Sequence, residues 1–188
     1  MRNKKLFLTF DDGPESSTES VLALLEKLKV PASFFVITEK AERSPKILQK
    51  ILSQGHSVGD HSLDHRYRAF FSSDQALESW ILNSHHRLAA LTGQKPIGFR
   101  PPAGVVTPPL KRVLAKNGIP LILWQRRFFD TVFPWTISAA RLSLGRTNDA
   151  DIVLLHDRVS SRRLPQFLKT LGFYIQEARK HGFEFSAL

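Results

Sequence analysis

Short apolar runs rich in β-branched and aromatic residues alternate with longer segments whose apolar residues recur at helical spacing. Leu6–Phe10, Ala32–Ile37 and Ile152–Leu155 are runs of the first kind, and Leu164–Lys180 is a segment of the second. Strands that alternate with helices through short connections are typical of a parallel α/β fold, either a barrel or a doubly wound sheet. We therefore expect one α/β domain over residues 1–188, with no internal linker or repeat.

The alternation predicts seven strands and the helices between them. The strands are expected at 6–10, 32–37, 56–60, 97–100, 120–124, 151–155 and 183–185. Helices are expected before Pro31, from Pro45 to Gly55, from Asp74 to Gly93, and over 108–116, 138–144 and 164–180.

Polar side chains occur repeatedly where an expected strand ends. Asp11 and Asp12 end the first strand, His61 and His65 follow the third, and further polar residues end the fourth (Arg100) and the sixth (His156). The carboxyl ends of the strands of a (β/α) barrel open on one face. We therefore expect these side chains to meet there and to form a site. An ordinary Asp-Gly turn after the first strand is the alternative for the two aspartates.

His61 and His65 stand four residues apart, a spacing that places both rings on one side of a helical turn. Together with a carboxylate from another strand they would make a two-histidine, one-carboxylate set, which leaves coordination positions open for water and substrate. Zinc suits this set, and other divalent ions are also compatible with it. The chain has no cysteine, so thiolate ligands, disulfides and thiol nucleophiles are excluded. A polar surface turn is the alternative.

Four ordered motifs resemble those of the NodB-like polysaccharide deacetylases. They are Thr9–Pro14 (TFDDGP), His61–His65 (HSLDH), Arg100–Gly104 (RPPAG) and Leu154–Asp157 (LLHD), and the resemblance extends from Leu6 to about Asp157. The resemblance implies an irregular (β/α) barrel with about seven parallel strands. It also implies the metal-dependent removal of N-acetyl groups from amino-sugar polymers. We expect the polymer to be peptidoglycan, with chitin oligomers as the less favoured substrate.

The resemblance also implies a role for each motif residue. Asp12, His61 and His65 would bind one divalent ion, expected to be zinc, with cobalt, nickel or manganese as alternatives. Asp11 would be the catalytic base, Arg100 would hold and tune it, and His156 would be the acid. The residues expected to contact the substrate are Pro102, Ala103, Trp124 and Leu154, the last of which would line the pocket for the acetyl methyl group.

The segment after the fifth expected strand departs from the family pattern. Trp124 is in place, but Gln125, Arg126 and Arg127 follow where acidic residues are expected. Asp130 is the residue that could orient His156, if the loop folds back. A glycan-binding domain with weakened catalysis is one alternative function, and a hydrolase of non-sugar linear or cyclic amides is another.

The charge is strongly basic, with 27 lysine and arginine residues against 17 acidic ones and a formal net charge of +10. Seven arginines follow strand ends and are expected around the active face: Arg66, Arg68, Arg126, Arg127, Arg158, Arg162 and Arg163. They favour an anionic glycan such as peptidoglycan, although charged, solvated loops are the alternative. No recognition-helix or aromatic strand motif supports nucleic-acid binding.

The chain shows neither an apolar run of the ~20 residues that a membrane span needs nor a signal peptide. As given it reads as cytoplasmic, while the family leads us to expect the cell envelope if the chain is a processed form. We expect a monomer. Of the remaining histidines, His56 is expected in the core, whereas His85 and His86 are expected to be solvated, and Trp135 is expected to pack internally.

Overall fold

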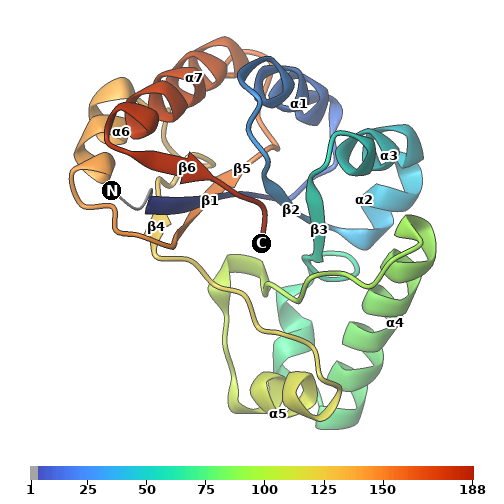
Figure 1. Ribbon diagram of the computed structural model, residues 1–188. Helices are drawn as coiled ribbons and strands as arrows, with labels where there is room; N and C mark the ends of the chain where they lie inside the picture. The colour runs from blue at the N-terminus through green and yellow to red at the C-terminus, as the bar shows by residue number, and fades with distance from the viewer. Residues whose placement is uncertain (1–3) are drawn as a thin grey trace.

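Strands and helices alternate along residues 4–188, which the computed structural model describes (Figure 1). The strands are β1 (Lys4–Asp11), β2 (Ser33–Val36), β3 (Ser57–Asp60), β4 (Arg126–Arg127), β5 (Asp151–His156) and β6 (Phe183–Phe185). The α-helices are α1 (Ser16–Leu28), α2 (Thr38–Arg43), α3 (Pro45–Ser53), α4 (Asp74–Thr92), α5 (Pro108–Lys116), α6 (Ile137–Leu144) and α7 (Leu164–Lys180). Two short 3-10 helices are η1 (Tyr67–Phe71) and η2 (Pro102–Gly104).

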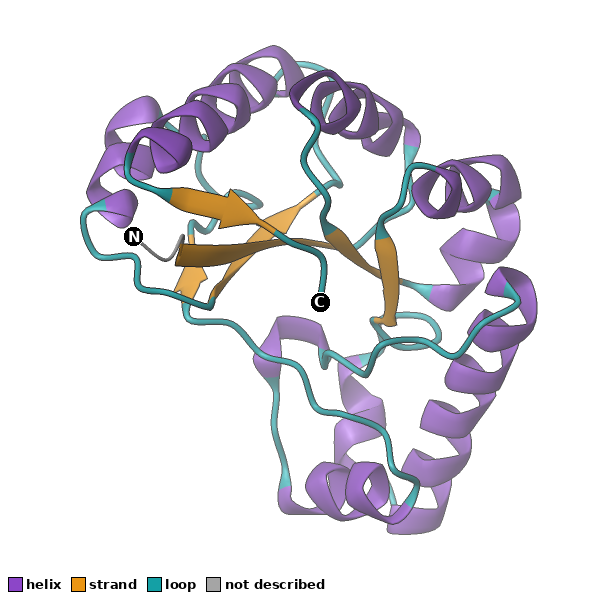
Figure 2. Cartoon of the chain, in the orientation of Figure 1, coloured by secondary structure: helices purple, strands orange, loops and turns teal. Residues whose placement is uncertain are grey.

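All the strand pairs described are parallel, in the order β3-β2-β1-β5-β4, with β6 paired to the first residues of β1 (Figure 2). β1 is the central strand and pairs along its length with β5, from Leu6 opposite Asp151 to Asp11 opposite His156. Because neighbouring strands run the same way, Asp11 and His156 end side by side at one edge of the sheet. The parallel α/β prediction is therefore confirmed.

Two of the expected strands, at 97–100 and 120–124, do not form ladders. Each makes only isolated bridges, in which Phe99 is opposite Asp60 on one side and Leu121 on the other. Pro101 and Pro120 explain this, since proline has no N–H to donate and interrupts a ladder. The fifth strand instead forms later, as β4, where it pairs with β5. The bridged segments still continue the path from β3 round to β4, so the sheet curls into an irregular barrel.

The helix ends follow local signals in the sequence. Ser73 caps α4 by accepting a hydrogen bond from the Ala76 N–H, and Gly93 ends that helix in the left-handed conformation with φ 68°. Thr107 caps α5 in the same way and is followed by Pro108, whose fixed φ suits the first helical turn. These residues make the helix positions readable from the sequence.

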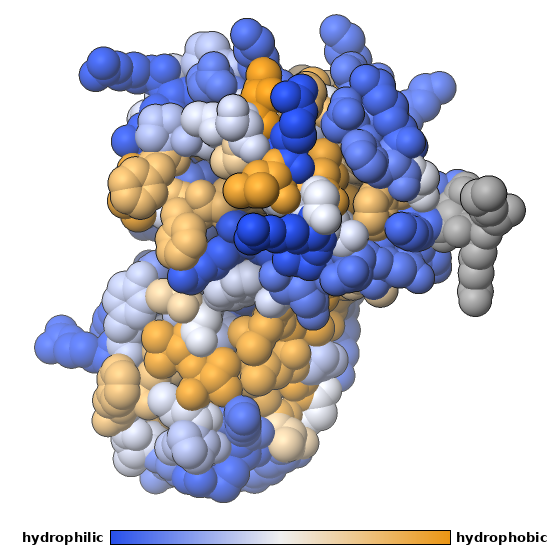
Figure 3. Space-filling view, turned by 90° about the vertical axis from the view of Figure 1, so that its left-hand side faces the viewer, coloured by the Kyte–Doolittle hydropathy of each residue, from blue (hydrophilic) through white to orange (hydrophobic). Residues whose placement is uncertain are grey.

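The core lies mainly between the sheet and the helices around it. Leu6, Leu8 and Phe10 of β1 are fully buried and pack in a large cluster with residues of α1 and α7. A smaller cluster joins Phe99 to α4 and α5, which Figure 1 shows away from α1 and α7. Figure 3 shows apolar side chains gathered on the lower part of one face, over the region of α5. Within residues 4–188, no helix combines the length and the apolar character that crossing a membrane requires.

Candidate active site

A cavity of about 340 Å³ opens where the carboxyl ends of the strands meet. Most of the side chains that the sequence places at strand ends line this cavity. They are Asp11, Asp12, His61, His65, Ala103, Trp124, Leu154 and His156. Arg100 lies behind the wall, in contact with Asp11, whereas Pro102 is buried and does not line the cavity.

Asp12, His61 and His65 converge as the sequence predicts. The Asp12 Oδ1 atom lies 3.4 Å from His61 Nε2 and 3.2 Å from His65 Nε2. The ligand atoms of the three residues all lie within 4.8 Å of one another, and no other group of three such residues in the described part of the chain does this. Burial alone would raise the pKa of Asp12, but hydrogen bonds with the two histidines outweigh it and lower that pKa far below its usual value.

The donor chemistry of this group fits a divalent metal ion. His61 Nδ1 is 2.8 Å from the Arg100 carbonyl oxygen, so this nitrogen carries a proton, and in the neutral ring Nε2 is the nitrogen left to bind a metal ion. Fixing the ring through its second nitrogen is how proteins orient histidine ligands. Two imidazole nitrogens and one carboxylate oxygen form a set that zinc accepts.

The two histidines come together on a tight loop, and the helical turn expected from their spacing is wrong. Residues 61–65 form no helix, and Ser62 and His65 have φ values of 79° and 61°. The loop is held by the Asp60 carboxylate, which accepts the Ser62 N–H, and by the Ser62 hydroxyl, which accepts the His65 N–H. These bonds turn the chain sharply enough to face both rings toward Asp12.

Asp11 is held by a buried arginine. Arg100 is fully buried, and its Nη1 donates to Asp11 Oδ1 at 2.8 Å and to Thr9 Oγ1 at 2.7 Å. Its guanidinium also stacks on the Phe35 ring, 3.8 Å from the centroid, and donates to two backbone carbonyls. These contacts hold the guanidinium in place, and its hydrogen bond holds the Asp11 carboxylate beside the Asp12–His61–His65 group.

His156 has an acidic partner, Asp130, although the segment after the fifth expected strand departs from the family pattern. Asp130 Oδ1 lies 2.9 Å from His156 Nδ1, and Asp130 Oδ2 accepts the backbone N–H of His156 at 2.8 Å. The loop does fold back, through a left-handed residue at Phe129 with φ 54°. Burial alone would lower the pKa of His156, but the Asp130 carboxylate outweighs it and raises the pKa to about 9.

Asp157, next to His156, joins the end of β5 to the first turn of α1. Its Oδ2 accepts a hydrogen bond of 2.6 Å from Thr18 Oγ1, and its backbone carbonyl accepts one of 2.5 Å from Ser17 Oγ. A Cβ at Gly13 would lie 2.1 Å from Asp157 Oδ2, so only glycine fits at this crossing. Burial raises the pKa of the Asp157 carboxyl to about 7.

Five residues lining the cavity were not singled out as substrate contacts by the motifs: Tyr67, Arg127, Phe129, Thr131 and Arg158. Tyr67 and Phe129 are 48 % and 49 % exposed, so they give the rim of the cavity two flat aromatic surfaces. In the sequence Tyr67 is two residues from His65 and Phe129 is next to Asp130, and this closeness to predicted site residues is the signal that could have identified them.

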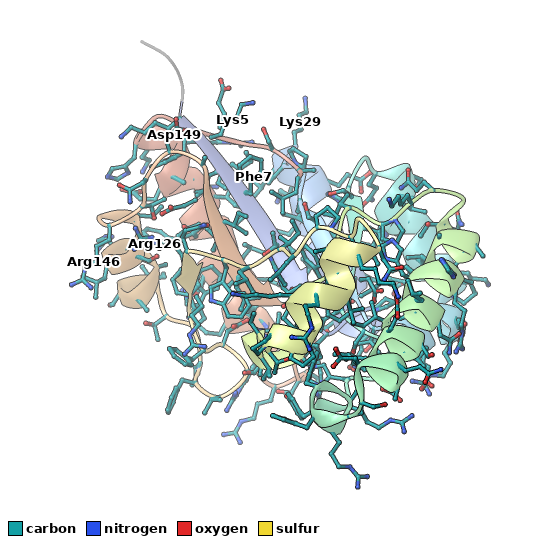
Figure 4. All side chains as sticks on the ribbon, turned by 90° about the horizontal axis from the view of Figure 1, so that it is seen from below. Lys5, Phe7, Lys29, Arg126, Arg146 and Asp149 are labelled. Carbon is teal, nitrogen blue, oxygen red and sulfur yellow. The ribbon has the colours of Figure 1, made fainter. Side chains whose placement is uncertain are left out.

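Of the seven arginines expected around the active face, Arg127 and Arg158 line the cavity, whereas Arg126 lies elsewhere. Arg126 donates to Asp151 Oδ2 and to the Arg146 carbonyl, at the opposite end of β5 from His156. Figure 4 shows Arg126 beside Arg146, with Asp149 on the same side of the molecule. Successive residues of a strand alternate in direction, so Arg127 lines the cavity whereas Arg126 does not.

Of the predictions for the other histidines, the one for His56 is confirmed and the one for His85 is wrong. His56 is buried as expected, and its Nδ1 accepts the Ala32 N–H at 3.1 Å. His85 was expected to be solvated, which is wrong: it is 4 % exposed, and its Nδ1 lies 3.7 Å from the buried Asp60 carboxylate. Trp135 packs in the core, as expected.

Comparison with known proteins finds polysaccharide deacetylases. Residues 1–122 match a family model described as polysaccharide deacetylase. A peptidoglycan-N-acetylglucosamine deacetylase of Bacillus cereus is 33 % identical over 187 residues, which cover 97 % of this chain and 86 % of that protein. Another such deacetylase, from Listeria monocytogenes, is 36 % identical over 156 residues, which are 82 % of this chain and 33 % of that longer protein.

Among solved structures, a family 4 carbohydrate esterase from Streptomyces lividans in complex with acetate has a TM-score of 0.86. The two chains are 26 % identical, and the match covers 97 % of this chain and 92 % of the other. The expected irregular (β/α) barrel is therefore confirmed.

Proposed function

The chain belongs to the polysaccharide deacetylase family, and on that premise we propose that it removes acetyl groups from N-acetylglucosamine residues of peptidoglycan with one divalent metal ion. One observation carries the proposal. Asp11, held by Arg100, and His156, held by Asp130, face the same cavity as the Asp12–His61–His65 group. A base, an acid and a metal-binding group in one cavity are what hydrolysis of an amide requires.

Asp12, His61 and His65 would hold the ion, and their donor set leads us to propose zinc. When bound, such an ion polarises the amide carbonyl and activates water. Asp12 serves as the ligand because its carboxylate faces both imidazole nitrogens.

Asp11 is the base in this proposal. Its Oδ1 is occupied by Arg100, and its Oδ2 lies on the side of His61, 3.8 Å from Nδ1. That carboxylate accepts the proton of the water that attacks the acetyl carbonyl carbon. The rigid contacts of Arg100 keep the base in place while the proton moves.

His156 is the acid. The amine of the sugar leaves only when its nitrogen is protonated, and a histidine with a raised pKa carries the needed proton at neutral pH. Asp130 binds Nδ1, so Nε2 is the nitrogen left to donate. The products are acetate and the free amino sugar, and the proton taken by Asp11 balances the one given by His156.

The acetyl methyl group is proposed to lie against Trp124 and Leu154, apolar side chains that line the cavity. Ala103 is at the same wall in a left-handed backbone conformation with φ 53°, which suits a backbone N–H donor to the carbonyl oxygen.

An acetate-release assay tests this function. The protein is freed of metal with a chelator, reconstituted separately with zinc, cobalt, nickel or manganese, and offered peptidoglycan, chitin oligomers and simple amides. We expect acetate from the glycans, most from peptidoglycan, and little from the simple amides. Equal rates on simple amides would contradict the proposal in favour of a general amide hydrolase.

Variants separate catalysis from binding. Asp11→Asn is expected to abolish acetate release while metal binding persists, because Asp11 is not in the ligand group. Asp149→Asn is the matched control, since Asp149 accepts the Lys5 N–H far from the cavity. Glycan binding by the wild-type protein with no acetate above the Asp11→Asn level would mean a binding domain without turnover.

A further inference from the structure

A second hollow, of about 360 Å³, adjoins the catalytic cavity on the side of the segment that joins β5 to α7. The two share Thr131 and Arg158 as lining residues. Asp130, whose carboxylate holds His156, also lines the second hollow. This space therefore begins one side chain away from the proposed proton donor, within reach of a group on a neighbouring sugar.

The lining of the second hollow has an excess of positive charge. Its two acids are already engaged, Asp130 with His156 and Glu15 with Lys40. Arg158 reaches Glu15 only at 3.9 Å, and its side chain is 62 % exposed.

Arg163 also lines the second hollow, and it is half-buried. Its Nη1 donates to the Thr131 carbonyl at 3.4 Å. Among residues 4–188, no carboxylate oxygen lies within 4.0 Å of the Arg163 side chain. A guanidinium that has lost part of its hydration without gaining an anionic partner favours binding of an anion.

A third hollow, of about 430 Å³, adjoins the second. The two share Asp130, Val159, Ser160 and Arg163, and the third adds Arg162. Guanidinium groups present a planar fork that matches a carboxylate through two parallel hydrogen bonds, and a serine hydroxyl supplies a further donor. Three arginines and one serine therefore follow one another along a path that leads away from His156.

We propose that Arg158 and Arg163 form a carboxylate subsite, which binds an acidic substituent of the sugar next to the one that is deacetylated. This inference rests on the proposed function, because that function places the reacting sugar in the adjoining cavity. In peptidoglycan the lactyl and peptide carboxylates are such substituents, whereas chitin has none. The subsite would therefore make the protein prefer the acidic polymer.

The test uses one oligosaccharide of alternating N-acetylglucosamine and muramyl peptide, in its free-acid form and with every carboxylate amidated. The kcat/KM ratio of the two forms is measured for wild type, Arg158→Gln, Arg163→Gln and Arg163→Lys. Arg112→Gln is the matched control, because Arg112 is an exposed arginine on α5, paired with Asp74 away from both hollows. Thermal unfolding of each variant verifies its fold.

We expect wild type and Arg112→Gln to prefer the free acid by about tenfold or more. Arg163→Gln is expected to lose most of that preference by slowing the acidic form only, and Arg163→Lys to keep part of it. Arg158→Gln is also expected to reduce the preference, by slowing the acidic form more than the amidated one. Equal rates on both forms with wild type, or equal losses on both forms in the variants, would overturn the subsite.

A binding measurement separates this inference from the proposed function. Calorimetry with Asp11→Asn compares the two oligosaccharide forms without turnover. Tighter binding of the free acid that Arg163→Gln removes would support the subsite even if no acetate were released. Acetate release from both forms with no difference in binding would leave the function standing and overturn the subsite.

Discussion

Replacing Asp130 by asparagine is expected to remove the proton that His156 donates while leaving the fold intact. The carboxylate of Asp130 binds both Nδ1 and the backbone N–H of His156. An asparagine amide has one oxygen and one NH₂ group, so it can accept only one of these hydrogen bonds and opposes the other. Burial alone lowers the pKa of His156, and of the carboxylates that raise it Asp130 has the largest effect, ahead of Asp11 and Asp12.

The size of the effect follows from the titration. With a pKa of about 9, roughly nine-tenths of His156 is protonated at pH 8, and at the ordinary value of about 6.5 only about 3 % is. The variant therefore loses about 30-fold in the active form at that pH, and the misoriented ring adds to the loss. We expect kcat to fall by about 10² to 10⁴, the range in which one general acid contributes.

The assay is kcat for acetate release between pH 5.5 and 10. In the wild type the basic limb is expected near pH 9, and in Asp130→Asn it moves down toward 6.5. Asp149→Asn, a surface aspartate at the far end of β1 and β5 (Figure 4), serves as the control and should match wild type. The double variant Asp130→Asn, His156→Gln should have nearly the same kcat as Asp130→Asn alone, because both changes remove the same proton donor. An unmoved basic limb with unchanged kcat in Asp130→Asn would refute this reasoning.

Three further predictions concern acid stability, metal binding and packing. Burial lowers the pKa of His56 to about 4, below its unfolded value, so stability is complete above pH 6.5 and is lost as pH falls toward 4. Between pH 7 and 4.5, urea unfolding of wild type should lose about 2–3 kcal/mol more than that of His56→Asn, with the exposed His86→Asn behaving as wild type. Asp12→Asn should weaken zinc binding by about 100-fold or more in a chelator competition, and unchanged affinity would exclude Asp12 as a ligand. Leu8→Ala should cost about 2–5 kcal/mol of unfolding free energy, against less than about 0.5 kcal/mol for the exposed Leu142→Ala.

The parts of the fold that depend on local signals were readable from the sequence. The last helix and strand, Leu164–Lys180 and Phe183–Phe185, lie where the periodicity predicts them. Asp11 ends β1 because an apolar run gives way to acids and a Gly-Pro pair. In these places the residues that decide an element's end lie within the element or next to it.

The prediction for His85 was wrong although the sequence carried a signal. The buried positions of α4 include Leu77, Ile81, His85 and Leu88, which follow the helical repeat. His85 lies on this apolar stripe, so the helical repeat itself favours its burial. Its neighbour His86 falls off the stripe and is exposed, as predicted.

Loops and isolated segments depended on contacts that the pattern of apolar residues does not contain. His61 and His65 converge because Asp60 and Ser62 fold a tight loop, not because four residues make a helical turn. The strands expected at 97–100 and 120–124 have the right composition, but their ladders are interrupted by prolines and reduced to single bridges. Arg126, in β4, pairs with Asp151 on the neighbouring strand and so turns away from the cavity.

The sequence by itself determined a parallel α/β fold and the edge of the sheet that carries the site. The alternation of strand and helix patterns specifies parallel strands. Parallel strands bring their carboxyl ends to the same side of the sheet, however the loops between them fold. Only the tertiary structure decided that Asp130 reaches His156 across 26 residues, and that Arg158 and Arg163 line a hollow beside it. Such contacts are set by how loops pack on the finished sheet, and a pattern of neighbouring residues does not contain that information.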